Sequence, residues 1–211
     1  MKIALLFYGR LNKFKEHKDN ILNAVGNDNY DDIDIFLSCS NEPDNIVSEF
    51  IELYKPKAIL NQNIILYQSM LNSLENKYRR DGCTKNIILH FMNKLNVFKL
   101  LLNHINKTNN KYDIIISLRL DLLIQDKFNF INNNNNFIYI PEGNDWEGGI
   151  NDQIAYGNLE VMQKYMCVFN NMIYLLNNKN NVIHPERIVR ENIYYNNLNM
   201  MRFNLNYIID K

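Results

Sequence analysis

The sequence predicts an α/β fold with a mostly parallel central sheet and helices on both of its faces. Strand-like and helix-like segments alternate through the first 124 residues, as expected for a parallel sheet with crossover helices. The run Ile114–Leu118 is apolar and β-branched, typical of a strand covered on both faces. We see no internal repeat and no interdomain linker, so one domain is expected over residues 1–211.

Three strands and three helices are expected before residue 80. Short apolar runs predict strands over Lys2–Tyr8, Ile33–Leu37 and Ala58–Leu60. Apolar residues at helical spacing predict helices over Phe14–Val25, Asp44–Tyr54 and Ile64–Arg79. Glycine and proline mark several boundaries, because both disfavour regular structure. These are Gly9, Pro43, Lys55-Pro56 and Asp81-Gly82.

The second half is expected to begin with a long helix and the strand at Ile114. The helix spans Ile87–Ile105 and has a well-patterned apolar face. Phe128–Ile131 and Phe137–Ile140 flank an asparagine run, Asn132–Asn136, and are expected to pair as a hairpin around that loop. The remaining elements expected are helices over Asn158–Leu176 and Pro185–Tyr195 and a terminal strand over Met201–Ile209.

Composition excludes several classes of protein. Lys+Arg and Asp+Glu both number 23, so the formal net charge is zero and no nucleic-acid partner is expected. Cys39, Cys83 and Cys167 show neither a disulfide framework nor zinc spacing, which indicates reduced thiols. The apolar stretch Ile3–Tyr8 is too short for a signal peptide or a membrane span. We therefore expect no transmembrane segment and a cytoplasmic location.

The strand at Ile114 ends in an Arg-x-Asp pair. Arg119 and Asp121 project from the same face of a continued strand, at the end where α/β folds bind ligands. A carboxylate at that position suits Mg²⁺ or Mn²⁺, which in turn holds a diphosphate. The structural alternative is an ion pair that caps the strand.

Common nucleotide-binding and hydrolase motifs are missing from the sequence. Gly9-Arg10-Leu11 is not followed by the glycines of a dinucleotide fingerprint, and neither a P-loop nor a G-x-S-x-G motif occurs. Polar groups at strand ends remain. The Arg10 guanidinium is suited to a base or a phosphate, or alternatively to a neighbouring acid. Ser38 is a weaker candidate, because loop serines usually bond to local backbone or water.

Four segments in order carry a resemblance to a known family. They are Tyr8-Gly9-Arg10, Asp34–Ser38, Tyr112–Asp121 and Asn151–Gly157. Together they resemble GT-A-type glycosyltransferases of large DNA viruses and of bacterial polysaccharide or lipopolysaccharide clusters. The similarity runs from the first strand to the His184-Pro185-Glu186 segment.

The resemblance implies a GT-A-like nucleotide-diphospho-sugar transferase domain with a UDP- or GDP-sugar donor and Mn²⁺ or Mg²⁺. It places Asp121 at the end of the metal-binding acidic motif. The usual Asp-x-Asp is changed, because Arg119 occupies the first position. This puts the strength of metal binding in doubt, and Arg119 is a candidate to neutralise part of the diphosphate charge itself. If the source is viral, the expected location is the host cytoplasm.

A glycine-rich acidic segment, Glu142–Gln153, is the candidate acceptor site for a glycan. Asp152 is the first choice for the base that takes the acceptor proton, with Glu147 and Asp145 as alternatives. Gln153 is a candidate to hold a sugar hydroxyl, and Trp146 to stack on a sugar ring. Asp152 as a cap and Trp146 as a packing residue are the structural alternatives.

Three further sites are candidates for active-site roles. His184 opens the last expected helix and either reaches the active site or caps and packs the helix start. Lys94 and the pair Arg79-Arg80 are candidate phosphate contacts, although a solvated helix face explains them more simply.

The expected donor site consists of Tyr8, Gly9, Arg10, Ser38, Arg119 and Asp121, with Asp121 also on the metal. The expected function is metal-assisted transfer of a sugar from a nucleoside diphosphate sugar to a hydroxyl acceptor. Two rivals stay open: a non-catalytic nucleotide- or sugar-binding domain of the same fold, and a nucleotidyltransferase.

Overall fold

The computed structural model describes residues 1–26, 32–78, 83–130, 136–178 and 183–210. The pair Arg79-Arg80 and most of the Asn132–Asn136 run therefore lie outside the described residues. A seven-stranded sheet forms the centre, in the order β3-β2-β1-β4-β7-β6-β8. Its strands are β1 (Ile3–Tyr8), β2 (Ile33–Ser40), β3 (Ala58–Gln62), β4 (Ile114–Leu118), β6 (Phe137–Pro141), β7 (Ile154–Gly157) and β8 (Asn199–Phe203).

The sheet is mostly parallel, as the sequence predicts. Strand β7 is antiparallel to both of its neighbours, whereas the other adjacent strands of this sheet pair in parallel. The reversal of β7 matters for the site, because it brings the residues that precede β7 to the end of the sheet where β4 also ends. Leu118 pairs with Ile154 across the two strands, so Arg119 and Asp152 come close together at that edge.

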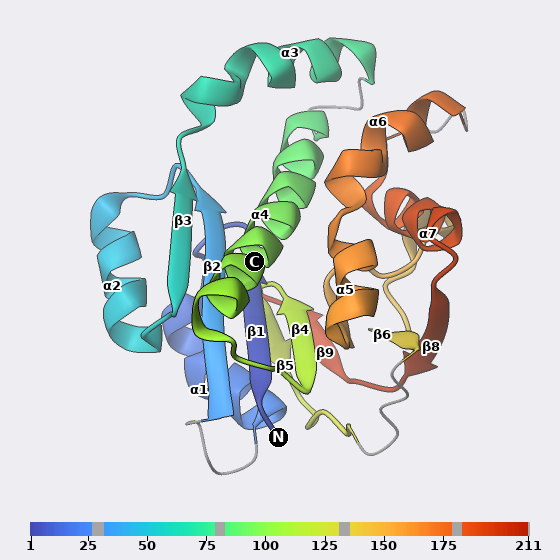
Figure 1. Ribbon diagram of the computed structural model, residues 1–211. Helices are drawn as coiled ribbons and strands as arrows, with labels where there is room; N and C mark the ends of the chain where they lie inside the picture. The colour runs from blue at the N-terminus through green and yellow to red at the C-terminus, as the bar shows by residue number, and fades with distance from the viewer. Residues whose placement is uncertain (27–31, 79–82, 131–135, 179–182, 211) are drawn as a thin grey trace.

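Two hydrophobic cores cover the faces of the sheet, and β1 contributes to both. Ala4, Leu6 and Tyr8 face one core, whereas Ile3, Leu5 and Phe7 face the other, because successive side chains of a strand alternate between its faces. The first face packs against α4 (Thr84–Thr108), α5 (Leu159–Met166), α6 (Val168–Asn178) and α7 (Pro185–Tyr195). The second packs against α1 (Phe14–Val25) and α2 (Asp44–Tyr54). Figure 1 shows α4 in front of the sheet and α1 behind it.

The predicted strand and hairpin at 128–131 are wrong for the residues that the structure describes. Residues 128–130 have no strand; Phe128 and Phe130 instead stack on each other at 5.6 Å and pack edge-on against Tyr156. Their apolar character serves aromatic packing and not sheet pairing. The short strand β5 (Leu122–Ile124) precedes them and pairs with β9 (Tyr207–Ile209), while β6 pairs with β7 and β8.

Three other predicted elements are divided. The terminal strand splits into β8 and β9, which belong to different sheets. The helix predicted over Asn158–Leu176 breaks at Cys167 into α5 and α6. The segment from Ile64 begins as a 3-10 turn, η2 (Ile64–Tyr67), and continues as α3 (Gln68–Lys77). Helix α4 is longer than predicted and runs beside β1, β2 and β3.

In the described part of the chain, no helix is both long and apolar enough to cross a membrane.

Candidate active site

A cavity of about 1180 Å³ opens at the carboxyl ends of β1, β2 and β4. It lies where the strand order reverses, because β1 pairs with β2 on one side and with β4 on the other. Open α/β sheets bind their ligands at such switch points. The lining residues that matter below are Tyr8, Gly9, Arg10, Ser40, Lys85, Asn86, His90, Asn93, Arg119, Asp121, Trp146, Asp152, His184 and Glu186.

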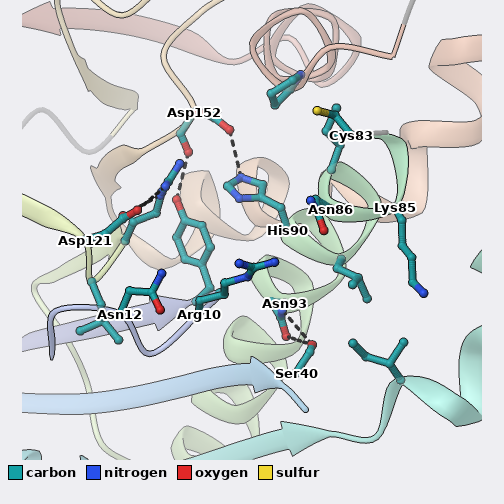
Figure 2. A pocket seen from close by; sticks show the side chains of 18 of the residues that line it. Arg10, Asn12, Ser40, Cys83, Lys85, Asn86, His90, Asn93, Asp121 and Asp152 are labelled. Atoms are coloured by element: carbon teal, nitrogen blue, oxygen red, sulfur yellow. Dashed lines mark hydrogen bonds and ion pairs between the residues drawn. The ribbon is translucent and has the colours of Figure 1, made fainter. Parts of the chain in front are cut away.

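The turn after β1 brings Arg10 to the cavity (Figure 2). Gly9 has φ +102°, a backbone angle that disfavours residues with a side chain. Its N–H donates to the carbonyl of Ser38 at 3.0 Å, which fixes the turn to β2. Ser38 itself is fully buried and does not line the cavity. Its hydroxyl donates a hydrogen bond to Asn93, which does line the cavity.

Arg119 and Asp121 form a bidentate ion pair at the end of β4. Arg119 Nε donates to Asp121 Oδ1 at 2.9 Å, and Arg119 Nη2 donates to Asp121 Oδ2. Burial disfavours the guanidinium charge, but the hydrogen bond and the attraction of Asp121 outweigh this and raise the pKa of Arg119. Both side chains still line the cavity. Arg119 and Asp121 therefore form the ion pair that was the structural alternative, and both also face the cavity where the sequence predicts a ligand.

The donor set does not fit a preformed Mn²⁺ or Mg²⁺ site. Both carboxylate oxygens of Asp121 already accept hydrogen bonds from Arg119. Among the described residues, no group of three His, Cys, Asp or Glu side chains is placed to hold a metal ion. Binding of a cation by Asp121 would require this ion pair to open.

Asp152 lies at the wall of the cavity, in a cluster of buried polar groups. Its carboxylate Oδ2 is 3.0 Å from Nε2 of His90 (Figure 2). Its backbone carbonyl accepts hydrogen bonds from Tyr8 Oη at 3.0 Å and from Lys94 Nζ at 2.6 Å. Only 3% of Asp152 is exposed. This contact network holds the residue in one position.

Electrostatics keep Asp152 ionised despite its burial. Burial raises its pKa, but His90, Lys94 and Arg119 together lower the pKa to about 2. Burial also lowers the pKa of Lys94 to about 8. The interpretation of Lys94 as part of a solvated helix face is wrong, because the residue is 1% exposed and its ammonium bonds to Asp152 and Tyr165.

A second histidine–carboxylate pair stands at the start of α7. Nδ1 of His184 is 2.7 Å from Oε2 of Glu186, and both side chains are buried at the cavity wall. Pro185 occupies the first turn of the helix, as the sequence predicts, but the His184 side chain makes no capping hydrogen bond. His184 thus reaches the site, together with Glu186.

The loop before β7 contributes Trp146 to the cavity rim. Trp146 lines the cavity and is 61% exposed, so it is not a core residue. Its two acidic neighbours turn away from the cavity: Asp145 pairs with Arg202, and Glu147 pairs with Arg187. Gln153 is buried and does not line the cavity. Of the predicted acceptor residues, the structure therefore brings Trp146 and His184 together.

Gly149 lets this loop pack directly on α7. A Cβ atom built at Gly149 would lie 2.3 Å from the backbone carbon of Glu186 and 2.5 Å from the nitrogen of Arg187. We expect Gly149→Ala to lower the free energy of unfolding by about 1–3 kcal/mol, because backbone atoms cannot move aside cheaply. Urea denaturation checks this. In Gly143→Ala, where the added Cβ meets nothing within 4 Å, the loss comes from the positive φ alone. An equal loss in both variants would contradict the steric explanation.

Helix α4 supplies the functional candidates that sequence reasoning missed. Asn86, His90 and Asn93 recur at helical spacing and line the cavity beside Lys94, which the sequence had already indicated. Asn93 accepts hydrogen bonds from Ser38, Ser40 and Gln62, which connects it to the ends of β2 and β3. The signal was a polar stripe on the inward face of an otherwise apolar helix.

Comparison with known proteins places this arrangement in a structural context. No protein-family model matches the chain, and no curated protein matches it significantly in sequence. Solved structures do match. The glycosyltransferase GlyE of Streptococcus pneumoniae superposes over 95% of this chain with a TM-score of 0.52 and 11% identity. Mouse xyloside xylosyltransferase 1 superposes over 96%, also with a TM-score of 0.52 and 11% identity.

The chain has a glycosyltransferase fold. Its seven-stranded, mostly parallel sheet flanked by helices matches that of both enzymes, and the predicted fold class is confirmed. The chain corresponds to 45% of the length of the GlyE chain and to 84% of the mouse enzyme chain. At 11% identity the likeness concerns the fold alone, so the roles of individual residues rest on the geometry of the site.

Proposed function

We propose that this protein transfers a sugar from a nucleoside diphosphate sugar to a hydroxyl group of a glycan or other acceptor. The glycosyltransferase fold supports glycosyl transfer in general. One observation points to the donor: the cavity at the switch point between β1 and β4 is lined by the cations Arg10, Lys85 and Arg119. Guanidinium and ammonium groups bind diphosphate oxygens and stabilise the charge of a departing diphosphate.

Residue roles follow from position in the cavity. Tyr8, Gly9 and Arg10 would lie along the nucleotide, and Arg119 with Asp121 would lie at the diphosphate. The acceptor would enter beside Trp146 and His184, on the wall formed by the loop before β7 and the start of α7. Ser38 would act by supporting Asn93, and Asp145, Glu147 and Gln153 would act only if the loop rearranges. A cytoplasmic setting is part of the proposal and fits the three cysteines, which are free thiols.

A panel of UDP- and GDP-sugars tests the donor assignment. The protein is mixed with each nucleotide sugar, and melting temperature and release of UDP or GDP are recorded. Ligands that bind the folded state raise its apparent stability. We expect one nucleotide series to raise the melting temperature and at least one sugar to be turned over. Binding without turnover of any sugar would favour the non-catalytic rival, and release of pyrophosphate from a nucleoside triphosphate would favour a nucleotidyltransferase.

The requirement for Mn²⁺ or Mg²⁺ remains a prediction from the sequence. Loss of turnover in EDTA, with recovery on addition of Mn²⁺, is the expected result if Asp121 binds a metal. Full turnover in EDTA would contradict the prediction. The diphosphate would then be neutralised by the protein cations that line the cavity, Arg10, Lys85 and Arg119.

A further inference from the structure

His90 occupies a distinctive place in the cavity wall. It projects from α4 into the cavity, between the buried cluster and the open space (Figure 2). Its ring packs edge-on against Tyr8 at 5.1 Å and against Phe91 at 5.1 Å. Two aromatic contacts and the contact with Asp152 fix the orientation of the imidazole. A fixed imidazole at the edge of a ligand cavity is suited to proton transfer.

Asp152 selects which nitrogen of His90 is available. The carboxylate is 3.0 Å from Nε2, although the two groups are not aligned for a hydrogen bond. This close carboxylate favours the neutral tautomer with its proton on Nε2 and its lone pair on Nδ1. The described residues offer Nδ1 no hydrogen bond. Asp152 cannot easily change position, because Tyr8 and Lys94 donate hydrogen bonds to its backbone carbonyl.

The surroundings favour the neutral imidazole at rest. Burial lowers the pKa of His90 most strongly, Lys94 and Arg119 lower it further, and Asp152 opposes them. Tyr8 faces the ring from β1 with its hydroxyl committed to backbone carbonyls. A neutral histidine beside a carboxylate can accept a proton, and the resulting charge is then stabilised by that carboxylate.

We propose that His90 is the general base of glycosyl transfer, and that Asp152 is the residue that positions it. This inference rests on the proposed function. Nδ1 of His90 takes the proton of the acceptor hydroxyl. The acceptor oxygen forms a bond to the anomeric carbon as the bond from that carbon to the diphosphate oxygen breaks. The nucleoside diphosphate leaves with the electron pair of the broken bond.

The assignment differs from the prediction that Asp152 itself takes the proton. A carboxylate with a pKa near 2 is a weak base, and its exposed fraction of 3% leaves little room for an acceptor. His90 lines the cavity and is more exposed than Asp152, so its imidazole is within easier reach of an acceptor hydroxyl. A single displacement of this kind also inverts the configuration at the anomeric carbon, which gives the proposal a stereochemical test.

The test compares His90→Gln with the wild-type protein, using the UDP- or GDP-sugar that the wild type turns over. Glutamine can keep an N–H donor near Asp152 but has no basic nitrogen. We expect kcat to fall by about 10²- to 10⁴-fold, the range for loss of a general base, while the Kd for UDP or GDP changes by less than about threefold. The wild-type kcat should also decline at acid pH as His90 becomes protonated, and this decline should be missing in the variant.

His104→Gln is the matched control, with the same substitution on the same helix. His104 packs against Phe36 and receives a hydrogen bond from Asn110, away from the cavity. The His104→Gln variant should retain the wild-type kcat. NMR of the product should show an inverted anomeric configuration.

Three results would overturn the base assignment while leaving glycosyl transfer intact: wild-type kcat in His90→Gln, an unchanged acid limb in that variant, or a product with retained configuration. If His90→Gln loses affinity for UDP or GDP as much as it loses kcat, His90 is a donor-binding residue and the assignment is also wrong. Absence of any donor binding by the wild type would instead defeat the proposed function, and the base assignment with it.

Discussion

Asp152→Ala is expected to lower the free energy of unfolding by about 3–5 kcal/mol at pH 7, because it leaves buried cationic groups without their carboxylate. Lys94 and Arg119 both lie close enough to shift the pKa of Asp152, and Lys94 is almost completely buried. The measurement is urea denaturation of the purified variant. Asp19→Ala, which removes an exposed carboxylate from α1, should change the free energy by less than about 0.5 kcal/mol. A similarly small effect in Asp152→Ala would contradict the buried-cluster interpretation.

The pH dependence gives a second readout for the same residue. The pKa of Asp152 is about 2 in the folded protein and 3.8 in the reference state. A carboxyl group with a depressed pKa stabilises the fold above the unfolded pKa, and that contribution disappears as pH falls through the folded pKa. We therefore expect about 2 kcal/mol of wild-type stability to be lost between roughly pH 4 and pH 2 through this group. Asp152→Asn should lack this component, and an unchanged acid profile in that variant would argue against the shift.

Arg119→Leu is expected to weaken binding of UDP or GDP by about 100-fold, equivalent to about 2.7 kcal/mol. The change removes a guanidinium from the cavity and leaves Asp121 as an uncompensated negative charge near the diphosphate. Isothermal titration calorimetry with the nucleotide preferred by the wild type measures this effect. Arg187→Leu is the matched control, since it removes an arginine paired with Glu147 outside the cavity.

The double variant Arg119→Leu/Asp121→Leu separates two sources of that loss. If repulsion by Asp121 causes most of it, the double variant should recover most of the affinity. If the guanidinium itself binds the diphosphate, the affinity should stay low although the unpaired carboxylate is gone. We expect the second result. Wild-type affinity in Arg119→Leu would remove Arg119 from the donor site.

The parallel half of the fold was predictable from local sequence. The strands β1, β2 and β4 are predominantly apolar segments, and their predicted boundaries agree with the structure within a few residues. The segment around Phe128 was misread because its apolar side chains fill an aromatic cluster and form no sheet pairing. Such packing depends on residues distant in sequence, including Tyr156.

Residues predicted from strand ends lie at one cavity in the structure, whereas most of the cavity residues on α4 were not predicted. Arg10, Arg119 and Asp121 were found from strand ends, and the structure brings them to one cavity. His90 was not found, because its partner Asp152 is 62 residues away (152 − 90). Only the tertiary arrangement shows that a polar stripe on α4 meets the segment before β7. The functional roles of all these residues remain predictions.

If the protein transfers a sugar as proposed, the reversed strand β7 places the donor and acceptor sides of the cavity on different segments of the chain. One side of the cavity, the proposed nucleotide side, is built by the parallel β1, β2 and β4, whereas the opposite rim comes from the loop entering β7 and from the start of α7. Exchange of residues 142–149 between homologous chains should therefore redirect which hydroxyl compound is glycosylated while the choice of activated sugar is preserved. Under the proposed function, this topology would make acceptor preference a modular trait.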